Sequence, residues 1–215
     1  MSIRTLPTVI GLLTLLASVS VAQDTLSLDA LKARYERIDD LRASFTQTIR
    51  SEIAGDSTQI RGQVLLSGNK YRVETPSQTV VTNGKTTWIY SPADSQVVIN
   101  DAEKRTSTIT PQTFLTTSTD QYKTTSTRSV TKNGVPHTVL SLEATASSTR
   151  FKTATLWVRR SDRLVTRLRA TDRNASTLTL DLRDLTVDPS LSGTPFRFSP
   201  PDGIEVVDLR SNTSQ

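Results

Sequence analysis

Apolar and polar residues alternate with a period of two along most of this chain, after one short segment with a helical period. In that first segment, five apolar residues recur at spacings of three and four, which places them on one face of a helix: Leu28, Leu31, Tyr35, Ile38 and Leu41. Ser27 or Asp29 is suited to cap its start. Asp39 and Asp40 oppose the helix dipole near its end, so we expect the helix to break there.

The alternating segments predict strands joined by tight turns. They begin at Phe45 and are residues 45–53, 60–66, 70–74, 78–82, 85–90, 96–99, 122–132, 135–143, 150–159, 164–172 and 177–187. Asn83-Gly84 and Asn133-Gly134 are strong hairpin signals. The pattern predicts a β-rich α+β fold: one antiparallel sheet of roughly ten or eleven short strands that curls toward a barrel, with an N-terminal helix.

Residues 101–119 interrupt the alternation. Pro111 suits the first position of a helix, and Phe114 and Leu115 are the only apolar pair that follows it. The segment is short, rich in Thr and poor in helix formers. We therefore expect a short helical element of low local stability.

Residues 1–22 have the pattern of an export signal. Arg4 supplies a basic start, and residues 9–16 form an apolar run that is short for a bilayer span. Ser20 and Ala22 place small side chains at −3 and −1 of a cut before Gln23. An uncleaved anchor helix is the alternative. We expect a signal peptide over 1–22, one domain over 23–215, and an exported protein.

Charge and composition narrow the functional classes. The chain of 215 residues has 26 basic and 21 acidic residues, and cleavage of the signal removes one base, which leaves a net charge of +4. Most of this excess lies in residues 157–169, as a solvated strand face or as a docking surface for an acidic partner or lipid headgroups. Aromatic residues that would stack on bases do not alternate with these charges, so we expect no nucleic-acid partner.

The chain has little catalytic chemistry. Cys is absent, and His137 is the only histidine. His137 has no Glu or His at a metal-ligand spacing, so we expect a surface or half-buried strand residue. A hydrolase would need a pair of acidic residues. Three pairs occur, and we expect them to be charges exposed to solvent: Asp39 with Asp40, Asp181 with Asp184, and Asp202 with Glu205. The sequence predicts neither an enzyme nor a cofactor or metal site.

A curled sheet with apolar inward positions either fills its interior or keeps a cavity. The inward candidates are Val64, Leu66, Tyr71, Val73, Trp88, Tyr90, Leu140, Leu142, Leu156, Val158, Leu178 and Leu180. Such a lining offers few directional donors and suits acyl chains better than polar ligands. An ordinary filled core is the alternative.

Several motifs, in order along the chain, resemble the LolA family of periplasmic lipoprotein carriers. They are Leu-Lys-Ala-Arg-Tyr at 31–35, Phe-Thr-Gln at 45–47, Gly62, Asn-Gly-Lys-x-x-Trp-x-Tyr at 83–90, and Phe-x-Phe-Ser-Pro-Pro-x-Gly-Ile at 196–204. The similarity implies a monomer whose sheet is an unclosed antiparallel β-barrel, or half-barrel, of about eleven strands, with an N-terminal helix and a short helical lid. On that reading the N-terminal helix and residues 110–118 form the lid, and Phe45, Phe114 and Leu115 join the acyl-binding residues.

The same resemblance implies the partners. An ATP-driven inner-membrane transporter releases acylated lipoproteins to the carrier, and the carrier passes them to an outer-membrane receptor. Many members also have an Arg-Pro that holds the lid, where this chain has Ser67-Gly68-Asn69. We expect either that another group, such as Arg61 or Lys70, holds the lid, or that this carrier cycles differently.

Three other functions remain open at this stage. A sensor module of similar half-barrel fold would bind lipid or lipoprotein as a signal in the cell envelope. A hydrolase of envelope polymers is disfavoured by the missing nucleophile–base pair. A structural envelope protein would have a filled core.

Overall fold

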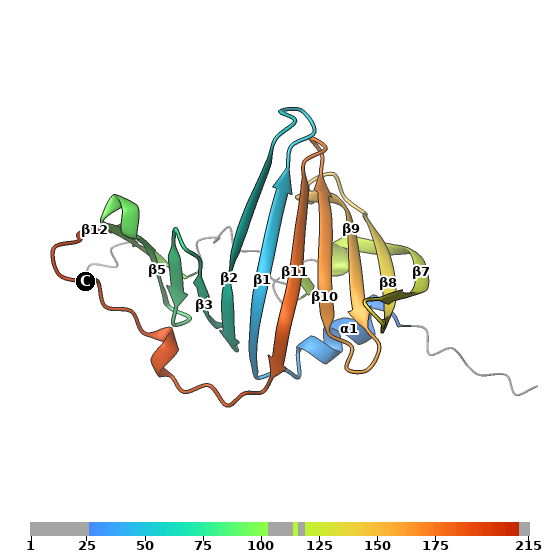
Figure 1. The fold of residues 1–215 in the computed structure, drawn as a ribbon, viewed down its shortest axis with the longest axis horizontal. Coiled ribbons are helices and arrows are strands. Elements are labelled where there is room, and N and C mark those ends of the chain that lie inside the picture. Colours follow the sequence, from blue (N-terminus) through green and yellow to red (C-terminus); the bar gives the residue numbers. More distant parts are fainter. Residues whose placement is uncertain (1–25, 103–113, 116–118, 211–215) are drawn as a thin grey trace, which may run out of the picture.

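The computed structural model describes residues 26–102, 114–115 and 119–210. Twelve strands of these residues form one sheet, drawn in Figure 1: β1 (Asp40–Arg50), β2 (Ser57–Ser67), β3 (Lys70–Glu74), β4 (Thr79–Thr82), β5 (Thr86–Ser91), β6 (Gln96–Asp101), β7 (Tyr122–Lys132), β8 (Val135–Ala144), β9 (Phe151–Arg159), β10 (Val165–Asp172), β11 (Thr177–Val187) and β12 (Glu205–Asp208). The helical elements are α1 (Leu28–Tyr35) and the short 3-10 turns η1 (Pro92–Asp94), η2 (Thr119–Gln121) and η3 (Thr194–Phe196). The predicted signal peptide over 1–22 lies outside the described residues, as does the predicted lid segment 110–118 apart from Phe114 and Leu115.

The sheet is open, and its order is β12-β6-β5-β4-β3-β2-β1-β11-β10-β9-β8-β7. Neighbouring strands are antiparallel except for β12, which pairs with β6 in parallel. Figure 1 shows the sheet curving from β12 to β7, with α1 against one end of β9 and β10. The predicted half-barrel with an N-terminal helix is therefore confirmed, with β12 as an additional edge strand.

The helix α1 is shorter than its apolar stripe suggested. Ser27 caps it, because the Ser27 hydroxyl oxygen accepts a hydrogen bond from the Ala30 N–H at 3.0 Å. The helix ends at Tyr35, and the buried Ile38 lies in the following turn. Leu41 already belongs to β1. Ile38 and Leu41 thus keep the apolar spacing because they pack on the same core, although they lie in a turn and a strand. For this reason the spacing predicted a longer helix than the structure has.

Strand register divides the sheet into two faces. Side chains of residues directly opposite each other on paired antiparallel strands point to the same face. Leu41 opposite Leu66, and Ala43 opposite Val64, belong to the face on which α1 lies, which we call the inner face. The opposite face is the outer face. Leucines and valines of the inner face form one continuous core with the buried side of α1.

A smaller apolar cluster lies on the outer face of β3 to β6. Val81, Val97 and Ile99 are buried there, together with Phe196 of the C-terminal tail. The tail is fixed to this face by the Pro195 carbonyl oxygen, which accepts a hydrogen bond from Arg72 at 3.3 Å. The rings of Tyr90 and Phe198 also pack together, with centroids 5.8 Å apart.

The start of the tail is fastened to the start of β1. One carboxylate oxygen of Asp188 accepts the backbone N–H groups of Asp39 and Asp40, at 3.0 and 3.2 Å. In return, the Asp40 carboxylate accepts the Leu191 N–H at 2.6 Å. Asp40 is buried, so the expectation that it is a solvated charge is wrong. No helix in the described ranges has the length and apolar character needed to cross a bilayer.

Candidate functional site

Among the described residues, α1 and the pair Phe114 and Leu115 cover the inner face of the sheet. From α1, Leu31 and Tyr35 are inserted into the core, and their exposed fractions are 0% and 1%. Phe114 and Leu115 are equally buried, at 4% and 0%. The Phe114 ring packs on Tyr122 with centroids 5.2 Å apart. These side chains therefore belong to one apolar cluster with the inner face of the sheet.

Thirteen of the fifteen residues predicted to bind acyl chains lie in this cluster. They are Phe45, Val64, Leu66, Tyr71, Val73, Phe114, Leu115, Leu140, Leu142, Leu156, Val158, Leu178 and Leu180. Phe45 and Tyr71 are partly buried at its margin, and the others are buried. The described structure thus brings predicted residues from six strands, together with residues 114–115, to one apolar surface.

Trp88 and Tyr90 are not on that surface. Trp88 pairs with Val81, while Ile89 pairs with Val80. Val80 in turn pairs with Val73 of the inner face, so Ile89 points inward and Trp88 points outward. The prediction that Trp88 and Tyr90 share a lining with Val73 is therefore corrected. In β5, apolar residues occupy both sets of alternating positions, so the sequence does not show which set points inward. Only the pairing with β4 decides this.

Sequence reasoning missed several members of the inner surface. Leu168 and Ala170 of β10 are fully buried there, alternating with arginines. Their period of two was a usable signal. Tyr122 and Phe151 gave no such signal, because each stands at the start of a strand. The Tyr122 hydroxyl donates to the Phe151 carbonyl oxygen at 3.0 Å, which fixes this corner.

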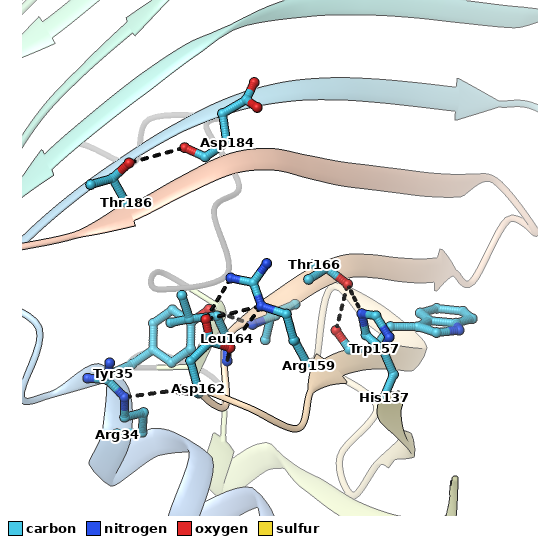
Figure 2. Close-up of polar contacts among 11 residues, drawn as sticks. Arg34, Tyr35, His137, Trp157, Arg159, Asp162, Leu164, Thr166, Asp184 and Thr186 are labelled. Atoms are coloured by element: carbon cyan, nitrogen blue, oxygen red, sulfur yellow. Dashed lines mark hydrogen bonds and ion pairs between the residues drawn. The ribbon is translucent and has the colours of Figure 1, made fainter. Parts of the chain in front are cut away.

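Polar contacts hold α1 to the turn between β9 and β10, as Figure 2 shows. The Val165 N–H donates to the buried Tyr35 hydroxyl at 2.9 Å. Arg34 donates from Nε to the Asp162 carbonyl oxygen at 3.3 Å. Burial raises the pKa of Tyr35 well above its usual value, so this hydroxyl stays protonated.

The same turn is itself braced by an ion pair. Arg159 donates to both carboxylate oxygens of Asp162, and its two bonds to Oδ2 measure 3.1 and 2.6 Å. The Leu164 N–H donates to the carboxylate at 3.2 Å. Burial raises the pKa of Asp162, but the hydrogen bonds and charge of Arg159 outweigh burial and hold that pKa below its usual value. The turn is therefore a firm anchor for α1.

A weaker contact joins α1 to η2. There, Lys32 approaches Asp120 of η2 at 3.9 Å, and the Asp120 side chain is 90% exposed. An exposed pair at this distance contributes little to stability. Of the polar contacts that α1 makes with the described residues, those with the β9–β10 turn therefore contribute more than the pair with η2.

The two basic residues suggested to hold a lid do not face α1. Arg61 pairs with Thr46, and both alternate with inner-face positions, so Arg61 lies on the outer face. Lys70 precedes the inward Tyr71 and also belongs to the outer face. The polar contacts that hold α1 to the sheet come instead from Arg34 and Tyr35 of the helix itself.

His137 is buried more deeply than expected. Its ring is 3% exposed, with Nδ1 2.8 Å from the Val135 carbonyl oxygen and Nε2 2.9 Å from the Thr166 hydroxyl. Figure 2 shows this pair beside Trp157. These contacts position a structural side chain. Among the described residues, no group of three or more acidic or histidine side chains could hold a metal ion.

Asp181 also departs from the expectation of a solvated charge. It lies in the central strand β11, where Arg167 donates to both carboxylate oxygens at 2.6 and 3.0 Å. Lys132 approaches the same carboxylate at 3.3 Å. Asp184, Asp202 and Glu205 are exposed, as expected.

An open, mostly antiparallel sheet whose apolar inner face lies under a short helix defines the half-barrel class of protein. A family model described as "Outer membrane lipoprotein carrier protein LolA" matches residues 36–199. The chain belongs to the LolA family. Membership implies a carrier rather than an enzyme, and a periplasmic location.

Individual relatives agree with the family. An outer-membrane lipoprotein carrier protein of Haemophilus influenzae (strain PittEE) is 28% identical over 184 residues, which cover 84% of this chain and 86% of the relative. One from Actinobacillus pleuropneumoniae serotype 7 (strain AP76) is 27% identical over 195 residues, which cover 87% and 86%. In fold, an uncharacterized conserved protein from Thermus thermophilus is similar, with a TM-score of 0.58, 15% identity, and coverage of 85% of this chain and 99% of that one.

Proposed function

We propose that this protein carries lipoproteins across the periplasm by enclosing their acyl chains between the inner face of the sheet and its cover. The observation that supports this most directly is the composition of that interface. Thirteen inward residues, drawn from six strands and from residues 114–115, are hydrocarbon or aromatic, and they form one uninterrupted surface. Acyl chains need such a surface, since they offer no groups for directional hydrogen bonds.

Loading requires the cover to move. Leu31, Phe114 and Leu115 already occupy the inner face and are almost completely buried. An acyl chain takes their place, and the contacts that it gains are partly offset by those that they lose. Phe114 and Leu115 belong to a segment whose sequence is poor in helix formers, which makes their displacement the less costly step.

This exchange keeps the affinity in a range that permits delivery. Burial of an acyl chain contributes ~0.8 kcal/mol per methylene, so a sixteen-carbon chain approaches ~12 kcal/mol. Two or three fully buried chains would exceed the limit of about 18–21 kcal/mol for non-covalent binding. Displacement of the protein's own side chains reduces the net gain, which allows the cargo to leave.

The rest of the transport route follows from the same role. The carrier receives acylated lipoproteins from an ATP-driven transporter in the inner membrane and delivers them to an outer-membrane receptor. It is exported by cleavage near Ala22 and acts as a monomer. A sensor of the same fold would instead hold its ligand and pass on a signal.

Site-specific photocrosslinking tests the location of the cargo. A benzophenone amino acid at Phe114, on the inner surface, is expected to crosslink to the acyl chains of a triacylated peptide. The matched control carries it at Thr153, which is exposed on the outer face beside the inward Ala154. Equal crosslinking at both positions would contradict the proposal. Transfer of the labelled peptide to outer-membrane vesicles then distinguishes a carrier from a sensor, which retains it.

A further inference from the structure

The outer face of the sheet carries a groove of about 910 Å³ that lies opposite the apolar inner surface. It runs from β2 over β1, β11 and β10 to the turn between β7 and β8. Five basic side chains line it: Arg61, Lys132, Arg159, Arg167 and Arg183. We call it the basic groove. Its position separates it from the surface that the carrier function uses.

Positive charges predominate in the basic groove. Asp181 is its only lining carboxylate among the residues that the structure describes. Even when Asp162, the partner of Arg159, is counted with it, the positive charges exceed the negative ones by three. Because this excess is concentrated in one concavity, it attracts anions more strongly than the same charges spread over a surface would.

Two of the contacts fix the shape of the groove. Lys132 and Asp181 are on β7 and β11, which are four strand spacings apart and would lie roughly 19 Å from each other in a flat sheet. Their side chains nevertheless meet at 3.3 Å. The sheet therefore curls toward its outer face at this corner, and the β7–β8 turn forms one wall. His137 and Thr166, hydrogen-bonded to each other, contribute to the lining.

Arg61 and Arg183 form the other wall and are exposed. They flank β1 on opposite sides: Arg61 pairs with Thr46, and Arg183 pairs with Ser44. Two strand spacings across and two residues along place their backbones roughly 12 Å apart. A β-bulge follows Arg183, where Asp184 has a φ of 52°. Bulges of this kind redirect neighbouring side chains and are common beside binding sites.

We propose that the basic groove binds a ligand that carries two or more phosphate groups. Arg61 and Arg183 carry planar guanidinium forks, which bind phosphate oxygens in pairs. The forks of Arg159 and Arg167 already hold carboxylates, so these two arginines contribute positive potential to the groove. Two phosphate monoesters carry about −3 to −4 at neutral pH, which matches the excess of three positive charges. The volume lies within the usual range for small-ligand sites, about 300–1,000 Å³, and a concave site suits a discrete headgroup better than a flat bilayer. The hydroxyls of Thr46 and Thr48 supply further donors.

Titration calorimetry with inorganic tripolyphosphate is the first test. We expect saturable binding to the full-length mature protein, with a loss of at least tenfold in affinity for Arg61→Gln combined with Arg183→Gln. The matched control is Arg42→Gln combined with Arg128→Gln, which removes the same charge from exposed outer-face positions that do not line the groove. The control should retain the affinity within about twofold. No saturable binding, or an equal loss in both double variants, would overturn the proposal.

Vesicles distinguish the source of the phosphates. Flotation with phosphatidylinositol-bisphosphate vesicles, compared with phosphatidylcholine vesicles, reports binding to a lipid headgroup, whereas tripolyphosphate binding without flotation indicates a soluble ligand. Either pattern supports the groove if it depends on Arg61 and Arg183. Binding of acidic proteins only, without either phosphate probe, would contradict it. Crosslinking of acyl chains at Phe114 should be unchanged in the groove variants, so the outcome is independent of the carrier function.

Discussion

The Tyr35 hydroxyl accepts a hydrogen bond from the Val165 N–H at 2.9 Å, across 130 positions of sequence. Both residues are almost completely buried. The bond gives the backbone N–H at the beginning of β10 a buried acceptor, and it joins α1 to the sheet. Tyr35 therefore positions the cover of the inner face as well as filling the core.

Tyr35→Phe should destabilise the protein by about 1–3 kcal/mol, because it leaves the buried Val165 N–H without an acceptor. Urea unfolding followed by circular dichroism measures the change. Tyr90→Phe, at a half-buried tyrosine of the outer face, is the control and should have a smaller effect. A Tyr35→Phe protein as stable as the control would show that this hydrogen bond is dispensable.

Gly62→Ala should destabilise the protein by about 2 kcal/mol or more. A Cβ atom at this position would lie 2.1 Å from the Glu74 carbonyl oxygen and 2.8 Å from the Phe45 ring. Glycine is needed here because two strands approach closely while an aromatic ring covers the gap. Gly193→Ala is the control, since its added Cβ would meet no atom within 4 Å. Chemical denaturation of both variants decides the matter, and similar midpoints would refute the steric argument.

The Arg159–Asp162 pair should make stability depend on acid pH. In the folded state the pair holds the pKa of Asp162 below the ordinary value of 3.8 that applies to the unfolded chain. The stabilisation is therefore fully present well above pH 3.8 and is lost as the pH falls from 3.8 through the lower pKa of the folded state. Asp162→Asn should be less stable than wild type at pH 7, and the difference should shrink at pH 3.

Urea midpoints at the two pH values measure this difference. Asp202→Asn changes an exposed carboxylate of the tail and serves as the control. A difference between wild type and Asp162→Asn that stays constant from pH 7 to pH 3 would contradict the assigned ion pair.

Phe114→Glu should reduce loading of a triacylated peptide by at least tenfold, because a carboxylate on the inner surface loses its hydration when an acyl chain binds. Co-purification of labelled peptide measures loading, and circular dichroism checks that the sheet remains folded. Thr153→Glu places the same charge on the outer face and should load normally. Wild-type retention by Phe114→Glu would exclude Phe114 from the acyl-binding surface.

Local pattern was sufficient for most of the fold. Alternation and turns such as Asn83-Gly84 identified eleven of the twelve strands, because one face of each strand is buried and the other is more polar. The parallel strand β12 was not identified, since four residues of tail carry no periodic signal. The side of the sheet to which Trp88 and Tyr90 point also could not be predicted. Both faces of β5 are covered, and only its pairing with β4 determines which residues point inward.

The two proposed surfaces differ in how far the sequence alone predicts them. Leu140, Leu156 and Leu180 belong to the inner surface, and each was predicted from its own strand. The basic groove depends on long-range arrangement. Arg61 and Arg183 come from opposite ends of the chain and become neighbours only through their shared partner strand β1. No short segment of the sequence could have shown that Arg61 and Arg183 lie near each other.

The tail between β11 and β12 links the middle of the sheet to its margin. It is tied to β1 through Asp188, passes β3 at Pro195, and ends as the strand that borders β6. In an open sheet the outermost strands are the ones that fray first. Here, peeling β6 away requires the tail to be stripped off and Phe196 to be exposed to water. The margin should therefore melt together with the centre, in one cooperative transition.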